Sequence, residues 1–171
     1  MLASKAEARM SYQTRESIGA ALGRIPLGLF VLTASHEDHR LGMLASWVQQ
    51  VCFEPPMVCV AVAKGRSILP LLSESRHFAL CQIAADDRII QRKFAKEFEP
   101  GEDPFLGFEL IHGSIRDLPI LSGCSAFMEC ELSCHLDVEG DHDLFIGKVK
   151  AGHATDKDPH VHFRDNGFDY A

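Results

Sequence analysis

Lys64-Gly65-Arg66-Ser67 is the stretch of this 171-residue chain whose residue types best suit the binding of an anion. It follows the apolar run of residues 57–63, and Ser67 can begin a helix that runs to about Ser75. Amides at a helix N-terminus, two cations and a hydroxyl group together can hold a phosphate. The same residues could also form a solvated basic turn with Ser67 as an ordinary N-cap, so the pattern by itself leaves both interpretations open.

A second candidate is Ala45-Ser46-Trp47, which contains the only tryptophan of the chain. Small side chains beside this tryptophan would allow a flat ligand to lie against the backbone. A tryptophan with small neighbours is equally typical of core packing. Pro55-Pro56 follows, and because proline has no amide donor the chain must leave the sheet there.

His142 is the third candidate, in the predicted turn Gly140-Asp141-His142-Asp143. Acidic neighbours favour a protonated imidazole, which would suit contact with an anionic cosubstrate, although many turn histidines are simply exposed. His160-Val161-His162 could supply two metal ligands, but the spacing matches no known zinc site, and no metal is predicted.

Nucleophilic catalysis is not indicated. Ser46 and Ser67 have no histidine close in sequence, and the motif G-x-S-x-G is absent. Glu129 and Glu131 share one face of a predicted strand and are expected to be solvated. The chain is therefore expected to hold a cofactor that carries the chemistry.

The elements that would position these residues are mainly strands. The first two, residues 29–34 and 42–53, are expected to pair across the polar turn 36–40. Further strands are predicted at 57–63 and 77–83, and residues 105–123 should be irregular with short strands.

Two helices are predicted besides the one that starts at Ser67. One covers about residues 13–23, with Thr14 as a cap. The other begins after Asp86 as the cap and has apolar residues at helical spacing, namely Ile89, Ile90, Phe94 and Phe98.

The longest alternating pattern covers residues 125–138. Its apolar members, from Ala126 to Val138, are predicted to form one buried face. Residues 144–149 return as the hairpin partner, and Asn166-Gly167 predicts a type I′ turn near the C-terminus.

This arrangement predicts a mainly β fold, a closed antiparallel barrel with inserted helices, because closure removes sheet edges. No G-x-G-x-x-G follows a strand, which disfavours a Rossmann site. We expect a flexible arm over residues 1–12 and a single domain over 13–171.

Composition excludes several other classes. The net charge is −7 without clustered Lys and Arg, so no nucleic-acid partner is expected. No apolar run approaches about 18 residues and no signal peptide is recognisable, so no membrane partner is expected. Six cysteines without a C-x-x-C pair indicate reduced, buried thiols and a cytoplasmic protein.

Several ordered motifs resemble the flavin reductase-like family of FMN-binding split barrels. They extend from about Ala20 to Tyr170 and include the Ala45-Ser46-Trp47 segment before Pro55-Pro56 and the segment from Gly140 to Gly147. The Ala-Ser-Trp-Val-x-Gln version also resembles the flavin reductase-like domain of flavodiiron proteins. The resemblance implies a Greek-key antiparallel split barrel and a homodimer with FMN in a groove at its interface.

The resemblance also assigns roles to residues. The flavin ring would rest along Leu44, Ala45, Ser46 and Trp47, and its phosphate at Lys64, Arg66 and Ser67. His142 would lie where NADH or NADPH approaches, as the catalytic residue. Leu44 replaces a usual Thr and Cys52 a frequent Ser, and the loss of the Thr hydroxyl favours a weakly held, exchangeable flavin.

The expected function is therefore an NAD(P)H-dependent flavin (FMN) reductase, with FAD or riboflavin as other flavin substrates. Its reduced flavin would serve a partner oxygenase or another electron acceptor. Two alternatives stay open: an FMN-binding electron-transfer or sensory module without NAD(P)H turnover, and a related split barrel that binds haem through one of its nine histidines.

Overall fold

The computed structural model describes Tyr12 and residues 14–170. Contacts divide the described residues into two compact units: residues 28–160, and a smaller unit formed by the described residues up to Leu27 together with residues 161–170. Within the described residues, every helix is too short or too polar to serve as a membrane span. The predicted arm lies outside the described residues except for Tyr12, and the expected single domain stays a prediction.

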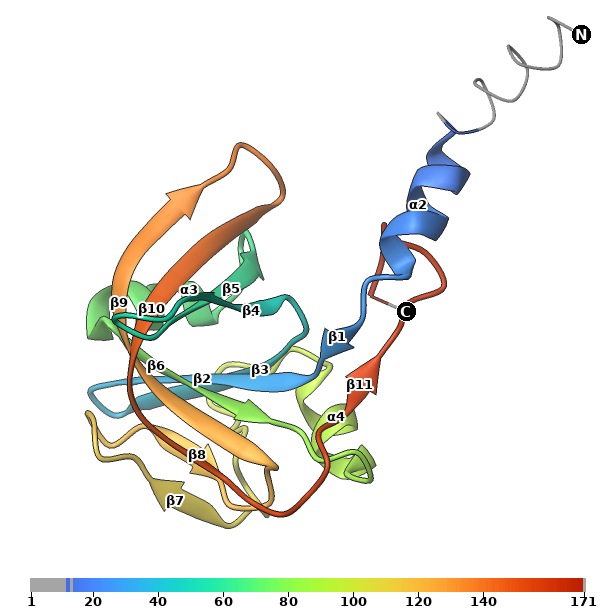
Figure 1. The fold of residues 1–171 in the computed structure, drawn as a ribbon. Coiled ribbons are helices and arrows are strands. Elements are labelled where there is room, and N and C mark those ends of the chain that lie inside the picture. Colours follow the sequence, from blue (N-terminus) through green and yellow to red (C-terminus); the bar gives the residue numbers. More distant parts are fainter. Residues whose placement is uncertain (1–11, 13, 171) are drawn as a thin grey trace, which may run out of the picture. The chain divides into compact units, whose positions relative to one another are not determined.

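A seven-stranded antiparallel sheet forms the larger unit (Figure 1). Its order is β3-β2-β6-β9-β10-β5-β4, where the strands are β2 (Phe30–His36), β3 (His39–Ala45), β4 (Val48–Cys52), β5 (Met57–Ala63), β6 (His77–Gln82), β9 (Ala126–Asp137) and β10 (His142–Ala154). The two edge strands, β3 and β4, are joined by Ser46 and Trp47 alone. The sheet must therefore curl until its edges approach, which confirms the mainly β, split-barrel fold.

The strand predicted over residues 42–53 is wrong as one element. It is two strands, because β3 pairs with β2 whereas β4 pairs with β5 on the other side of the barrel. The break falls at Ser46-Trp47, where the chain changes from one edge of the sheet to the other. The strands predicted at 29–34, 57–63 and 77–83 are confirmed as β2, β5 and β6.

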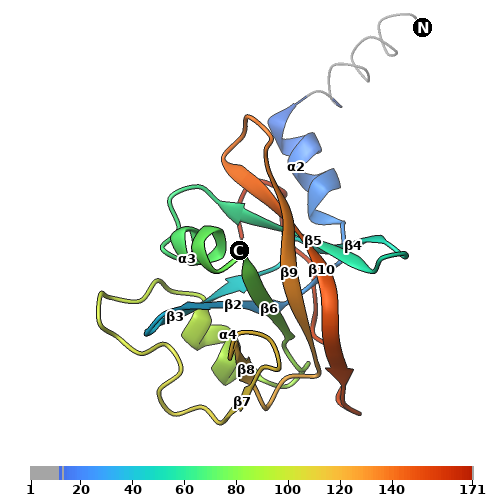
Figure 2. The same cartoon turned by 90° about the vertical axis from the view of Figure 1, so that its left-hand side faces the viewer.

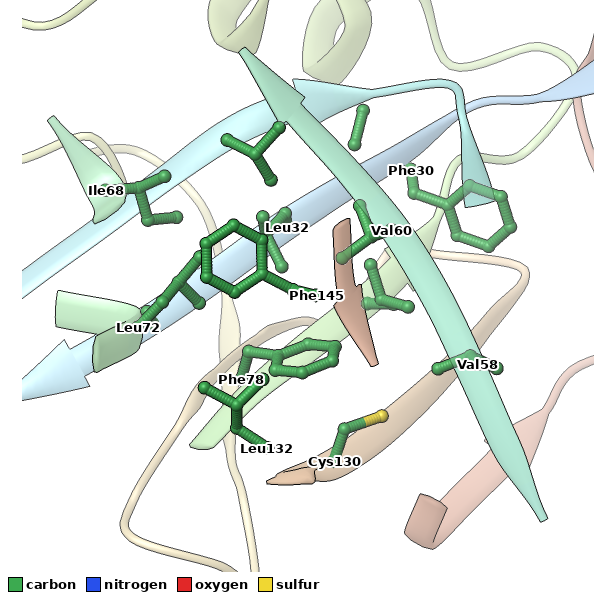
Figure 3. Packing of buried hydrophobic residues seen from close by; sticks show 14 residues of the cluster. Phe30, Leu32, Val58, Val60, Ile68, Leu72, Phe78, Cys130, Leu132 and Phe145 are labelled. Carbon is green, nitrogen blue, oxygen red and sulfur yellow. The ribbon is translucent and has the colours of Figure 1, made fainter. Parts of the chain in front are cut away.

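Two hydrophobic clusters stabilise this unit. Inside the barrel, Val60, Phe78 and Phe145 pack against Ile68 and Leu72 of α3 (Ile68–Ser75) (Figure 3). The second cluster lies on the other face of β2 and β6, under α4 (Arg88–Phe94) and the hairpin of β7 (Leu110–His112) and β8 (Pro119–Leu121). Figure 2 shows β2, β3 and β6 running between α3 and α4.

The two-sided burial of β2 explains its sequence. Phe30 and Leu32 belong to the barrel cluster, whereas Leu29 and Val31 belong to the second. A strand covered on both faces is apolar without alternation, as residues 29–34 are.

The helix predicted after Asp86 is confirmed as α4, but its details differ. Asp87, not Asp86, is the N-cap, since its carboxylate accepts the amides of Ile89 and Ile90. Ile89, expected on the buried face, is exposed, while Ile90 and Phe94 are buried.

The long alternation of β9 is interrupted, and the prediction of one continuous buried face is wrong. Ile146 pairs with Cys134 but Gly147 pairs with Leu132, so Ser133 is an extra residue in β9. One extra residue reverses the faces of the residues that follow. Leu132 is therefore buried, whereas Leu136 and Val138 are 45% and 51% exposed.

Glu129 was predicted to be solvated, and the structure places it in the interior at 3% exposure. Its carboxylate accepts the Ser114 hydroxyl and the Ile115 amide, at 3.0 and 2.8 Å. These bonds compensate the buried charge and fix the turn between β7 and β8.

The smaller unit contains α2 (Arg15–Gly23), and β1 (Leu27–Gly28) pairs with β11 (Val161–His162). Thr14 caps α2 as predicted, because its hydroxyl accepts the Ser17 amide. The prediction of a type I′ turn at Asn166-Gly167 is wrong. Neither residue has a positive φ, and the Asn166 side chain instead accepts the Phe168 amide.

Candidate functional site

The link between β3 and β4 forms one wall of the candidate site. Leu44 packs against the second cluster and Ala45 lies in the barrel cluster, so both side chains point into cores. Ser46 and Trp47 are half-buried and stand outside the strands. The side chains that a ligand could reach in this segment are therefore those of Ser46 and Trp47, while Leu44 and Ala45 offer main chain.

His142 lies directly beside Trp47. The ring centroids are 4.6 Å apart with an interplanar angle of 48°. His142 opens β10 and pairs with Ala63, the last residue of β5. Because the Trp47 carbonyl also accepts the Ala61 amide, the β3–β4 link, the end of β5 and the start of β10 meet at one corner.

Asp141 orients the imidazole. Its Oδ1 lies 2.7 Å from Nδ1 of His142. A carboxylate only accepts hydrogen bonds, so Nδ1 carries the proton. The hydrogen bond with His142 lowers the pKa of Asp141.

Lys64 follows at the same corner. Its amide donates to the Asp141 carbonyl at 2.9 Å, which ties the turn after β5 to the β9–β10 turn. Its ammonium donates to Asp137 at 2.8 Å and lies 3.6 Å from Asp143. The hydrogen bond between Lys64 and Asp137 raises the pKa of the lysine and lowers that of the aspartate.

Asp143 explains why a cation is needed here. It is 9% exposed, and within the described part of the chain its Oδ1 accepts no hydrogen bond. Oδ2 lies 3.1 Å from Nε2 of His135, whose ring stacks on buried Phe145 at 4.6 Å between centroids. A buried carboxylate requires compensating charge, and Lys64 supplies it beside Oδ1.

Arg66 and Ser67 complete the predicted phosphate site. Gly65 adopts φ +85°, a conformation that favours glycine, and it turns the chain into α3. Arg66 donates to Glu97 at 2.8 Å. Ser67 occupies the N-cap position of α3 as predicted, but its hydroxyl makes no capping hydrogen bond.

The structure thus brings Ser46, Trp47, His142 and Lys64 to one corner, with Arg66 and Ser67 on the turn that continues from it. Sequence reasoning missed the carboxylates of Asp137, Asp143 and Glu97, which pair with the two cations. Asp137 and Asp143 flank the predicted β9–β10 turn, and antiparallel pairing could have indicated that they face each other. Glu97 carries no comparable signal. Among the described residues, no group of three or more His, Cys, Asp or Glu side chains could hold a metal ion.

Comparison with known proteins identifies the family. Residues 22–170 match the family model described as the flavin reductase like domain. Diflavin flavoprotein A 1 of Synechocystis sp. is 37% identical over 133 residues, which cover 77% of this chain and 23% of that protein. The chain spans about a quarter of the length of the curated relatives it matches.

Solved structures of flavin reductases resemble this chain and agree with that family assignment. The NADH:FAD oxidoreductase SgcE6 of Streptomyces globisporus C-1027 is 26% identical with a TM-score of 0.79, covering 86% of this chain and 87% of that one. The styrene monooxygenase flavin reductase SMOB of Pseudomonas putida S12 is 26% identical with a TM-score of 0.71, covering 84% and 90%. The family model covers most of the described chain and the sheet order agrees with a split barrel, so this chain belongs to the flavin reductase-like family.

Proposed function

We propose that the chain binds FMN at the Trp47–His142 corner and reduces flavin with NADH or NADPH. The observation that carries the proposal is the convergence of three segments far apart in sequence. Trp47, Lys64 and His142 come from the β3–β4 link, the turn after β5 and the start of β10. Family membership supports a flavin as the ligand.

The residues present fit a phosphate-bearing flavin. Ser46 is small, and a Cβ built on Gly65 would meet nothing within 4 Å, so the turn has open space beside it. At the start of α3 the Leu69 amide donates to the Arg66 carbonyl at 3.1 Å and Pro70 has no amide, so the helix contributes mainly the positive end of its dipole to an anion site. Lys64, Arg66 and Ser67 would hold the phosphate, while the main chain of residues 44–47 would support the ring.

A bound flavin would supply the ring that accepts a hydride. The chain's own residues would hold and orient the reactants. Trp47 would shield one side of the site from water, and His142, fixed through Nδ1 by Asp141, would direct its other nitrogen to the nicotinamide cosubstrate. SgcE6 has been solved in complex with NAD and FAD fragments, which supports both ligand classes.

The decisive test is the absorption spectrum of the purified chain, followed by titration with FMN and steady-state oxidation of NADH and NADPH. We expect flavin binding and oxidation of at least one nicotinamide in the presence of flavin. Absence of any flavin binding, as purified or on titration, would refute the proposal.

Mutation of the phosphate site gives a sharper test. Lys64→Ala and Arg66→Ala should each weaken FMN binding by about tenfold, because each variant loses a charge-assisted hydrogen bond to the phosphate. Riboflavin, which has no phosphate, should bind both variants almost as well as the wild type. Equal losses for the two ligands would show that the phosphate lies elsewhere.

A homodimer is part of the proposal. Beyond the Ser133 bulge, Leu136 of β9 and Val138, which follows the strand, are exposed, and Leu136 pairs with half-buried Leu144 of β10. Exposed apolar surface of this kind is typical of an interface. Light scattering after gel filtration should give twice the chain mass, and Leu136→Lys should reduce it; a monomeric wild type would contradict the dimer.

A second function is supported by the curated relatives. They are diflavin flavoproteins of which this chain spans about a quarter, so the fold can form part of a larger flavoprotein. In that case the chain would bind FMN without NADH or NADPH turnover. Bound flavin with negligible oxidation of either nicotinamide would favour this alternative over the reductase.

An oxygenase is the proposed acceptor class if the chain is a reductase. The structural neighbour SMOB is the flavin reductase of a styrene monooxygenase. Release of reduced flavin into solution, measured by reduction of added cytochrome c, would support delivery to such a partner. Reduced flavin that stays bound would oppose it.

A further inference from the structure

Both cations of the proposed phosphate site are already neutralised by carboxylates of the chain itself. Asp137 accepts from the Lys64 ammonium and Glu97 from the Arg66 guanidinium, each at 2.8 Å. These are distances of charge-assisted hydrogen bonds. A phosphate that approached the two cations would therefore have to displace these acids or share the cations with them.

The two acids differ from Asp143 in a decisive way. Asp143 is buried and needs Lys64 as a counter-charge, so that contact is structural. The side chains of Asp137 and Glu97 are each 63% exposed and could be solvated by water after losing their cation. They can thus release it at small cost, as exposed ion pairs do.

The positions of Asp137 and Glu97 also suit competition with a phosphate for the two cations. Asp137 ends β9, where its Oδ1 additionally accepts the Glu139 amide at 2.8 Å, so its carboxylate is held in place before any ligand arrives. Glu97 follows α4 and reaches Arg66 from an element that contributes nothing else to the proposed site. Two separate segments thus each place one carboxylate on one cation.

We infer that Asp137 and Glu97 compete with the flavin phosphate for Lys64 and Arg66. They would thus be specificity-determining residues that reduce the preference of the site for flavins that carry a phosphate. The inference rests on the proposed function. Its consequence is an FMN that exchanges more readily and a smaller preference for FMN over riboflavin than the two cations would give without these acids. Such exchange suits a protein that treats flavin as a substrate.

The test uses Asp137→Asn, Glu97→Gln and the double variant, titrated with FMN and with riboflavin. The side-chain carbonyl of the Asp137→Asn variant can still accept the Glu139 amide, so the turn is preserved. Each single variant should bind FMN about two- to fivefold more tightly, the range expected for an exposed ion pair, and riboflavin unchanged. The double variant should bind FMN more tightly than either single variant, because each substitution frees a different cation of the same phosphate site.

A matched control separates competition from a general change in charge. Glu131 lies on β9, as Asp137 does, and forms an exposed ion pair with Lys150 of β10. Glu131→Gln removes one negative charge there and leaves the partners of Lys64 and Arg66 in place. It should leave FMN affinity unchanged. An equal gain in Glu131→Gln would attribute the effect to net charge and overturn the inference.

A second control uses the cations themselves. Glu97→Gln in an Arg66→Ala background should no longer change FMN affinity, because the cation for which Glu97 competes is absent. A persistent gain in that background would overturn the inference. If the wild-type chain binds neither FMN nor riboflavin, the proposed function itself fails; normal flavin binding without any gain in the variants refutes the competition alone.

Discussion

Gly147 of β10 offers a quantitative test of the barrel core. It is buried opposite Leu132, and a Cβ added there would lie 2.6 Å from Cζ of Phe78 and 2.9 Å from Cβ of Cys130. The Phe78 ring would have to retreat by about 0.8 Å to reach the 3.4 Å at which ordinary contact begins. Phe78 is completely buried in the barrel cluster, so the ring has no free space (Figure 3).

Gly147→Ala should therefore destabilise the fold. Overpacking of a close-packed core costs about 1–3 kcal/mol, and the reduced backbone entropy of the unfolded chain returns about 0.5 kcal/mol. We expect a net loss of about 1.5 kcal/mol. For an m-value of about 2 kcal/mol per M, the urea midpoint should fall by about 0.75 M.

Gly140→Ala is the matched control. A Cβ there would lie 4.0 Å from Cγ2 of Val138, and Gly140 has no left-handed φ. Its free energy of unfolding should stay within about 0.5 kcal/mol of the wild-type value. A Gly147→Ala variant as stable as this control would show that the core is less tightly packed than the structure indicates.

Three further results are expected. Asp87→Ala should lower the free energy of unfolding by about 1 kcal/mol, because two α4 amides lose their acceptor. Asp86→Ala should have little effect, and equal effects of the two variants in urea titrations would contradict the capping assignment. Burial raises the pKa of the Cys130 thiol to about 12, so Cys130 should resist alkylation by iodoacetamide from pH 7 to 9 until the chain unfolds. Labelling of Cys130 in the native state, detected by mass spectrometry, would refute this. Flavin should quench the fluorescence of Trp47, the only tryptophan; saturable flavin binding without quenching would place the ring away from this corner.

Local pattern was sufficient for much of the fold. The run 57–63 is β5, Ser67 begins a helix that ends at Ser75, and residues 142–154 form the partner of β9. In each case the signal lies within one element: an apolar run, a cap position or a turn between two strands. The predicted members of the site on these elements, Lys64, Ser67 and His142, were located for the same reason.

Errors arose where one residue changes the geometry of those that follow. The break at Ser46-Trp47 is invisible to a hydrophobic pattern, because both sides are strand-like and differ only in their partners. The Ser133 bulge leaves the sequence alternation intact but reverses the faces, so Leu136 became exposed and His135 came to stack on Phe145.

The sequence by itself determined the residue types of the site and the elements that carry them. The tertiary structure decided what those residues contact: Trp47 lies against His142, and Lys64 donates to Asp137, 73 positions along the chain. It also buried Glu129, whose charge is compensated by a turn that local sequence does not place nearby. The physical reason is that periodicity reports which face of an element is apolar, while the charge that meets a given cation depends on strand order and register, which are set only when the whole sheet forms.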